Sequence, residues 1–523
     1  MTAIRVRRTL AAAPLVESRA GRLTLVAAVA GGVALLIRLA LHGRSFDLFG
    51  DEVIYTELGH SVVSGGFPQC CGAGDFFLHG PGFFYLAAGW ARLLGNAPGL
   101  MAQVYQLRML NALLAAATAV VLVLLATRAS SLRVGAVTGL LFALEPFCIR
   151  QNDRVMLETG LMLWVVLGYL VFTSLIGRLP SRRDWPRAVV AGLLFGCAAL
   201  TKDEGALLTV LPLLAAAALR WGPRRALTLL TAGTTVAVYA AYVAVVTANG
   251  LFRAFWEAKA SGVQRMLGVS QESGFNSSGG GSLPVRLIAE ANYFGTTYVV
   301  LALAVPALVV VLRRGGQLPR MLGLIYCAAG VTLAYDLVLG TLEEQELYLL
   351  IVPSLLVIPV ATDLLLDESR RFRRPRRWRR RRRPWTAVIT VALTLTISLN
   401  LTTFVQRLRQ PDNGAAQLFR YMAAHVPVGT LVGQTAGDEI AEYALSNWYQ
   451  VGLWLTPAAL SEARARYLLV QWGPVNEGYS DPPSQVRQLV AHSRLVFSFW
   501  GPTYGQLALY ELPQPSASVR TRR

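Results

Sequence analysis

Lysine is nearly absent from this chain of 523 residues, and charge of any kind is scarce. Only 15% of the residues are Asp, Glu, Lys or Arg, whereas soluble proteins carry about a quarter. Hydrophobic residues make up 54%, which excludes an ordinary soluble protein and predicts an integral membrane protein. The net charge of +19 comes almost entirely from arginine, because Lys202 and Lys259 are the only lysines.

Other common signals are also missing. The five cysteines show no spacing typical of a metal site, and we find no inverted repeat and no Gly-rich phosphate loop in the C-terminal part. The densest run of positive charge, Arg370–Arg383, resembles a nucleic-acid patch in composition alone. Because this run lies between two long apolar segments, we expect it to bind anionic lipids at the membrane surface, and we expect no nucleic-acid partner.

Long apolar runs predict the architecture. Between residues 23 and 405 about eleven runs are of membrane-spanning length, which predicts an α-helical polytopic membrane protein. The first run, 23–42, is too long for the apolar part of a signal peptide, so we interpret it as a retained anchor. The short loops on one side are rich in arginine, which places residues 1–22 and the loop 367–384 in the cytoplasm. An odd number of spans then places the C-terminus outside the plasma membrane.

Three segments are expected on the outer side of the membrane domain (23–405). The long first loop, 43–106, contains two candidate interfacial helices, at 51–64 and 82–94. The loop 249–292 is rich in Ser and Gly in its second half and is interpreted as a lid or a linker. Residues 406–512 predict a small α/β domain, followed by a disordered tail at 513–523. The strands of this α/β domain are expected at 430–434, 467–471, 494–500 and 507–512, and its helices at 438–448 and 483–491.

Ionisable and polar side chains gather where the predicted spans reach the outer face. Such residues are costly beside a membrane, and acids and bases together are what an anionic lipid headgroup and a general base require. The set comprises Asp51, Glu52, Tyr55, His79, Glu145, Arg150, Asp153, Arg154, Glu158, Lys202, Asp203, Glu204 and Glu346. Simpler interpretations exist for some members. Arg154 and Glu158, four residues apart, would share a helix face and form a structural ion pair, and Asp203 would neutralise Lys202.

A divalent metal ion is a candidate cofactor for this set. His79 and Glu52 are its candidate ligands, although a single histidine is a weak metal signal. Glu145, near the end of a short span, is expected in the site or in a water-filled cavity, because a carboxylate facing lipid is disfavoured.

Several short motifs, taken in order, carry a family resemblance. The chain resembles the GT-C superfamily of polytopic glycosyltransferases, in particular the protein mannosyltransferase and lipid A aminoarabinose transferase type (glycosyltransferase family 39-like). The matching motifs are Gly50-Asp51-Glu52-x-x-Tyr55, His79-Gly80-Pro81-Gly82-Phe83-Phe84-Tyr85, Arg154-x-x-x-Glu158 and Leu200-Thr201-Lys202. One departure is Glu346-Leu347-Tyr348, where family members often have Arg-Tyr.

The resemblance implies an enzyme that transfers a sugar from a polyprenyl-phosphate donor to a glycan, lipid or protein acceptor, with inversion. Asp51 is then the candidate general base, and Glu52 is a candidate either for orienting the acceptor or for sharing a metal ion with His79. Arg154 and Lys202, with Arg150 behind them, are the candidates for binding the donor phosphate. The candidate substrate-binding residues are Tyr55, His79, Glu158 and Glu145.

Other functions remain open at this point. A transporter or lipid flippase would use ionisable groups along a path through the membrane. An oligosaccharide ligase would move a whole glycan from its lipid carrier. A membrane scaffold would bind a partner through the external domain.

Overall fold

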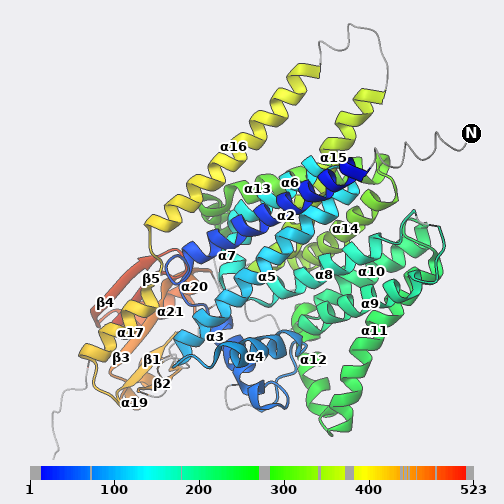
Figure 1. Ribbon diagram of the computed structural model, residues 1–523. Coiled ribbons are helices and arrows are strands. Elements are labelled where there is room, and N and C mark those ends of the chain that lie inside the picture. Colours follow the sequence, from blue (N-terminus) through cyan, green and yellow to red (C-terminus); the bar gives the residue numbers. More distant parts are fainter. Residues whose placement is uncertain are drawn as a thin grey trace, which may run out of the picture.

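The structure is a computed structural model, and it describes part of the chain in detail. The described residues are 13–513 except 71–73, 178, 270–282, 340–342, 372–381, 436–439, 441–444, 446–447, 455 and 478–479. Helices form a long bundle, and a small sheet lies at one end of it (Figure 1). Most of the predicted lipid-binding run 370–383, and the tail after residue 513, fall outside the described residues.

The bundle begins with α2 and continues to α16. Its helices are α2 (Ala13–Leu41), α3 (Gly50–Ser61), η1 (Val62–Ser64), α4 (Gly82–Leu94), α5 (Leu100–Ala129), α6 (Leu132–Leu144), α7 (Pro146–Asp153), α8 (Leu157–Thr173), α9 (Asp184–Thr201), α10 (Glu204–Leu219), α11 (Arg225–Ala248), α12 (Phe252–Met266), α13 (Leu283–Arg314), α14 (Gln317–Val338), α15 (Glu344–Arg371) and α16 (Arg382–Arg409). The fold class predicted from the sequence, a helical polytopic membrane protein, is confirmed.

The predicted number of spans, about eleven, is not confirmed. Among the described residues, six helices are long and apolar enough to cross a membrane, and the pair α6 and α7 makes a seventh if it is one bent span. That pair bends by 60°. The bend has a local cause: Glu145 precedes Pro146, which favours extended backbone, and the Glu145 carboxylate accepts a hydrogen bond from the Cys148 N–H as the cap of α7. The apolar helices α8 and α10 are shorter than a full span.

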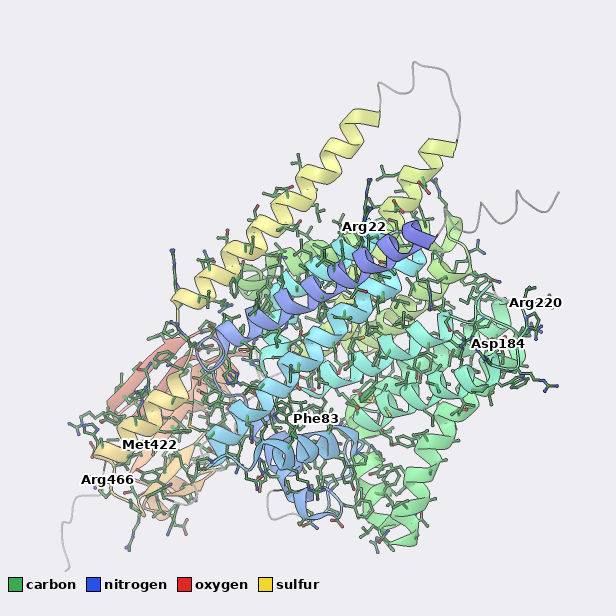
Figure 2. The ribbon with its side chains drawn as sticks, in the orientation of Figure 1. Arg22, Phe83, Asp184, Arg220, Met422 and Arg466 are labelled. Carbon is green, nitrogen blue, oxygen red and sulfur yellow. The ribbon has the colours of Figure 1, made fainter. Side chains whose placement is uncertain are left out.

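The segment 43–106, which the sequence predicts to be an external loop, contains the two predicted helices. They are α3, continued by η1, and α4. On α4, Phe83 is buried against the bundle while Tyr85 and Leu93 are exposed, as expected of a helix at a membrane surface. The helix therefore buries the face that carries Phe83 against the bundle (Figure 2).

The C-terminal domain is built on a five-stranded mixed sheet. Its strands are β1 (Leu431–Gln434), β2 (Gln450–Gly452), β3 (Tyr467–Gln471), β4 (Arg494–Gly501) and β5 (Gly505–Glu511), in the order β2-β1-β3-β5-β4. The helices are α17 (Gly414–His425), α19 (Pro457–Glu462), α20 (Trp472–Glu477) and α21 (Pro483–Val490). The predicted strands and the helix at 483–491 are present, while β2, α17, α19 and α20 were not predicted. The expected helix at 438–448 lies largely outside the described residues.

The two ends of the bundle differ in what they carry. The sheet, α3, α4 and α12 lie at one end, while the ends of α15 and α16 that flank 372–381 lie at the other (Figure 1). Arg22 and Arg220 also lie toward that second end, away from Met422 and Arg466 in the sheet domain (Figure 2). This arrangement agrees with the sidedness expected from the arginine-rich loops; the assignment of that end to the cytoplasm remains a prediction.

Candidate active site

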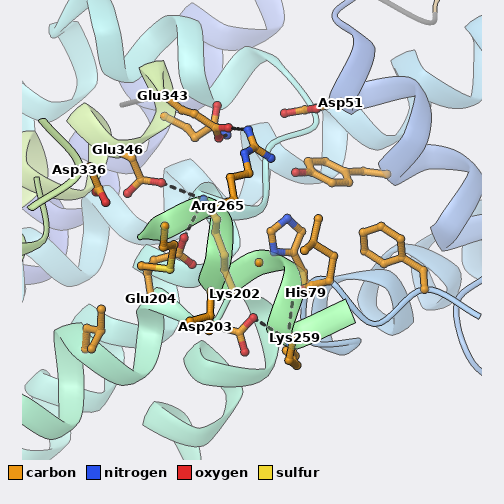
Figure 3. A pocket seen from close by; sticks show the side chains of 18 of the residues that line it. Asp51, His79, Lys202, Asp203, Glu204, Lys259, Arg265, Asp336, Glu343 and Glu346 are labelled. Atoms are coloured by element: carbon orange, nitrogen blue, oxygen red, sulfur yellow. Dashed lines mark hydrogen bonds and ion pairs between the residues drawn. The ribbon is translucent and has the colours of Figure 1, made fainter. Parts of the chain in front are cut away.

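A cavity of about 590 Å³ opens at the same end of the bundle as the sheet. It lies between α3, the segment before α4, the junction of α9 and α10, α12, and the start of α15 (Figure 3). The ionisable and aromatic residues of its lining are Asp51, Tyr55, Phe76, His79, Lys202, Asp203, Glu204, Lys259, Arg265, Asp336, Glu343 and Glu346. Seven residues of the polar set predicted from the sequence thus share one cavity: Asp51, Tyr55, His79, Lys202, Asp203, Glu204 and Glu346.

Asp51 enters the cavity from the first turn of α3. It is half-buried, and the N-terminal turn of a helix stabilises a carboxylate through its unpaired N–H groups. The helix is fixed at this end because the Glu52 carboxylate accepts a hydrogen bond of 3.0 Å from the Phe49 N–H. Asp51 and the Arg265 guanidinium lie on the same side of the cavity (Figure 3).

Lys202 ends α9 and is almost completely buried. Its Nζ lies 2.7 Å from Glu158 Oε1, 3.1 Å from Glu346 Oε1 and 3.4 Å from Glu204 Oε1. The predicted neutralisation of Lys202 by Asp203 is replaced by these three carboxylates. Asp203 instead accepts hydrogen bonds of 2.7 Å from the Tyr239 hydroxyl and from Lys259 Nζ.

Two cations of the cavity were missed by the sequence analysis. Lys259 donates to Asp203 and, over 3.0 Å, to the carbonyl of Leu78, and Arg265 forms an ion pair with Glu343. Both lie on α12, within a loop that was interpreted as a lid or a linker. A signal was available, because 252–266 alternates apolar and charged residues at helical spacing and contains one of the only two lysines.

His79 lies against aromatic rings in the cavity wall. Its ring centroid is 6.1 Å from that of Tyr55 and 6.0 Å from that of Phe76. Burial, together with the nearby charges of Lys202, Lys259 and Arg265, holds the pKa of His79 well below its usual value, so the ring is neutral at pH 7. The loop that carries it is pressed onto α9, since a Cβ on Gly80 would lie 2.3 Å from the Leu200 carbonyl oxygen.

Glu52 lies elsewhere, in a closed network. Its two oxygens accept hydrogen bonds of 2.8 and 2.6 Å from the Arg108 guanidinium and one of 2.7 Å from the Val155 N–H, in addition to the bond from Phe49. The side chain is fully buried and is not part of the cavity lining. Among the described residues no group of three His, Cys, Asp or Glu side chains is arranged to hold a metal ion. Glu52 and His79 therefore do not fit a shared metal site, and we derive no step through a metal.

Sequence and structure comparisons agree on the fold. The sequence model of the dolichyl-phosphate-mannose-protein mannosyltransferase family matches residues 88–256. No curated protein matches the chain in sequence.

Two solved structures are similar over 94% of this chain. The archaeal oligosaccharyltransferase AglB from Archaeoglobus fulgidus, in complex with an inhibitory peptide and a dolichol-phosphate, is 13% identical, with a TM-score of 0.57 and 75% of its own chain covered. ArnT from Cupriavidus metallidurans, bound to undecaprenyl phosphate, is 16% identical, with a TM-score of 0.54 and 98% covered.

The chain shares the fold of AglB and ArnT, the GT-C fold. In this GT-C fold the remaining predicted residues lie outside the cavity lining. Glu158 is buried behind Lys202, and Glu145 caps α7 and also accepts a hydrogen bond from the Thr297 hydroxyl. The Arg150 guanidinium lies over the Phe294 ring, 5.1 Å from its centroid.

Arg154 faces the C-terminal domain of the GT-C fold rather than the cavity. Its Nη2 donates a hydrogen bond of 2.9 Å to the Thr503 hydroxyl in the turn between β4 and β5. The expectation that Arg154 and Glu158 share a helix face is wrong, because the backbone is extended at Arg154, between α7 and α8. The backbone carbonyls here accept hydrogen bonds from a side chain instead of from helical N–H groups. The Asn111 amide donates to the carbonyls of Arg154 and Met156.

Proposed function

We propose that this protein is a membrane glycosyltransferase that moves a sugar from a polyprenyl-phosphate donor to an acceptor at the extracytoplasmic face, with inversion. The observation that carries the proposal is the cavity, where Asp51 lies together with the cations Lys202, Lys259 and Arg265. A carboxylate and fixed cations in one cavity are what this reaction needs. The GT-C fold supports it, and so do the polyprenyl phosphates bound to AglB and ArnT.

Asp51 is the proposed general base. An acceptor hydroxyl gives its proton to the Asp51 carboxylate while its oxygen attacks the anomeric carbon of the donor sugar. The bond from that carbon to the phosphate oxygen breaks on the opposite face of the ring, so the configuration inverts and the polyprenyl phosphate leaves. No nucleotide is needed, because the donor is already activated.

The leaving phosphate needs fixed positive charge. Lys259 and Arg265 both enter the cavity from α12, which places them to stabilise the charge that develops on the phosphate. Each is held by a carboxylate, Asp203 or Glu343, so each is positioned before a donor binds. Lys202 retains its proposed role as a further cation. We assign Arg154 and Arg150 no contact with the phosphate, because neither lines the cavity.

A gene deletion tests the function as a whole. The source cells without this gene should lose one sugar from a glycan, glycolipid or glycoprotein of the cell envelope, as measured by mass spectrometry. The wild-type gene should restore it. Loss of a whole glycan from its acceptor would indicate a ligase instead, and an unchanged envelope would contradict the enzyme proposal.

The Asp51→Asn variant tests the base. We expect turnover to fall by about 10²–10⁴-fold, the usual effect of removing a general base, while the protein still inserts into the membrane at a normal level. Glu57→Gln is a matched control, since Glu57 lies on the same helix outside the cavity lining and its neutralisation should leave turnover near normal. Near-normal transfer by Asp51→Asn would overturn the assignment of the base.

A further inference from the structure

The linker 44–49 between α2 and α3 is a place where the C-terminal domain contacts the bundle, and it ends immediately before the helix that carries the proposed base. From the C-terminal domain, the backbone N–H of Asp412 donates a hydrogen bond of 2.6 Å to the Arg44 carbonyl. The Ala415 N–H, in the first turn of α17, donates one of 2.9 Å to the Asp47 carboxylate. The linker is therefore fixed at two points to the start of the C-terminal domain.

The turn between β4 and β5 reaches the same linker from a later part of the domain. Tyr504 is almost completely buried, and its hydroxyl donates a hydrogen bond to the carbonyl of Leu48, three residues before Asp51. The neighbouring Thr503 donates to the Asp412 carboxylate, over 3.1 Å from its N–H and over 2.7 Å from its hydroxyl. Because the turn is bound to the segment that begins the domain, both parts contact the linker as one unit.

Arg154 connects this turn with the start of α3. Its Nη2 donates a hydrogen bond of 2.9 Å to the Thr503 hydroxyl. Its guanidinium lies 4.9 Å from the ring centroid of Phe49, the residue at the N-cap of α3, and 5.9 Å from that of Phe46. A cation is attracted to the face of an aromatic ring, most strongly where both are shielded from water, and Arg154 is only 2% exposed. Arg154 thus links the C-terminal domain to the end of α3 that carries the base.

These contacts affect the base because Asp51 lies in the first turn of α3. A shift of the linker would move the Asp51 carboxylate directly, and small displacements of a catalytic group are costly. On the opposite side of the linker, Arg108 of α5 donates hydrogen bonds of 2.8 and 3.0 Å to the carbonyls of Phe46 and Asp47. The linker is therefore held between α5 and the C-terminal domain, and the bond from Tyr504 lies nearer to α3 than these two.

We propose that Tyr504, Thr503 and Arg154 are positioning residues, through which the docked C-terminal domain sets the place of Asp51 in the cavity. None of the three lines the cavity as described, so they act on the reaction through α3. The inference rests on the proposed function, since it requires Asp51 to be the general base. The C-terminal domain then contributes to proton transfer although its described residues are not among those that line the cavity.

Tyr504→Phe is the first test, because it removes one hydroxyl and keeps the buried ring. We expect kcat to fall about tenfold through the displaced base. The KM for the donor should stay near the wild-type value, because Lys259 and Arg265 on α12 are unchanged. The donor is polyprenyl-phosphate mannose, replaced by the sugar that the deletion cells lack if that sugar differs, and membranes of the deletion cells supply the acceptor.

Tyr449→Phe is the matched control. Tyr449 is a buried tyrosine of the same domain, and its hydroxyl donates a hydrogen bond of 3.3 Å to a backbone carbonyl, that of Val426, within the domain. Both variants should lose a similar amount of thermal stability in detergent. Only Tyr504→Phe should lose kcat, since only its hydroxyl contacts the linker.

Combination with Asp51→Asn separates a positioning role from a structural one. If Tyr504 acts through the base, Tyr504→Phe should lower kcat by less than twofold once the Asp51 carboxylate is gone. A residue that only supports the fold would lower the amount of folded protein in both backgrounds and leave the kcat of the folded molecules unchanged. Thr503→Val, of nearly the same shape, removes the hydroxyl between Arg154 and Asp412 and should show the same pattern, which covers the case in which Tyr504→Phe does not fold.

Two different failures can be told apart. Wild-type kcat in both Tyr504→Phe and Thr503→Val, or an equal loss with and without the Asp51 carboxylate, would overturn the positioning role and leave the proposed function intact. Near-normal turnover by Asp51→Asn alone would overturn the base, and this inference with it.

Discussion

Two groups of charged side chains lie at the end of the bundle that carries the sheet, and they differ in how completely they are paired (Figure 1). In the closed group, Glu52 and Arg108 bind each other, and the Glu52 carboxylate accepts four hydrogen bonds. In the open group, Lys202 contacts three carboxylates, and the Oε2 atoms of Glu204 and Glu346 are buried without a hydrogen-bond partner among the described residues. The first group is fully paired within the fold, whereas the second group lines the cavity.

The two groups begin from neighbouring residues. Asp51 and Glu52 are adjacent in sequence, but consecutive residues on a helix point in different directions. On α3 this turns Asp51 toward the cavity and Glu52 toward Arg108 on α5. In the sequence these adjacent acids look like one functional pair, but the helix turns them toward different partners and so gives them separate roles.

The largest expected effect concerns the closed group. Arg108→Met should lower the free energy of unfolding by about 3–5 kcal/mol, because it leaves the Glu52 carboxylate buried without its counter-charge. The measurement is thermal unfolding of the protein in detergent, together with its yield from membranes.

The double variant Arg108→Met/Glu52→Gln is the control for this prediction. It removes both charges and should recover part of the lost stability, since a neutral amide costs less to bury than a carboxylate. If Arg108→Met unfolds like the wild type, Glu52 and Arg108 do not form the structural pair described above.

An intermediate effect on stability is expected where the loop before α3, next to the closed group, contacts the C-terminal domain. Burial and the nearby charge of Asp412 raise the pKa of Asp47 to about 8. The Asp412 carboxylate, also buried, accepts hydrogen bonds from the backbone N–H of Asp47 and from Thr503, and its Oδ1 has no partner among the described residues. Two carboxyl groups thus meet where the sheet docks onto the loop before α3.

The sign of the pH dependence follows from the raised pKa. Asp47 releases its proton near pH 4 when unfolded and near pH 8 when folded, so the free energy of unfolding should fall across this range, by up to about 1.4 kcal/mol per pH unit. Asp412→Asn should make this fall shallower, because it removes the charge that helps to raise the pKa of Asp47. The check is the melting temperature of both proteins from pH 5 to 9; identical slopes would contradict the coupling.

Much of the fold was predictable, because it follows from apolar length and charge. The long apolar segments gave the helical membrane class, and Pro81 and the aromatic residues of 82–94 gave α4 at its observed bounds. The number of membrane spans was harder to predict from the sequence. Glu145 and Pro146 lie within a nearly continuous apolar region, and only the backbone geometry shows that α6 and α7 bend there.

The candidate site was predictable in part. Asp51, Tyr55, His79 and Lys202 were named from their motifs, and all four line the cavity. Whether a charged side chain faces the cavity or a neighbouring helix depends on partners far away in sequence, such as Arg108 for Glu52 and Thr503 for Arg154. Lys259 and Arg265 were missed because they belong to no motif and reach the cavity only through the packing of α12.

The smallest expected changes in stability come from substituting two glycines, one packed at the cavity and one exposed to solvent. In Gly80→Ala the new methyl group would lie 2.3 Å from the Leu200 carbonyl oxygen, so the loop that carries His79 must move. We expect a loss of stability of about 1–3 kcal/mol and a fall in turnover of about tenfold or more, since small displacements of a site are costly. On the exposed face of α4, nothing lies within 4 Å of a Cβ at Gly89, so Gly89→Ala should gain about 0.5–1 kcal/mol and keep full turnover. Thermal unfolding and transfer assays of both variants decide the matter: if Gly80→Ala behaves like Gly89→Ala, the contact with Leu200 does not position His79 in the cavity.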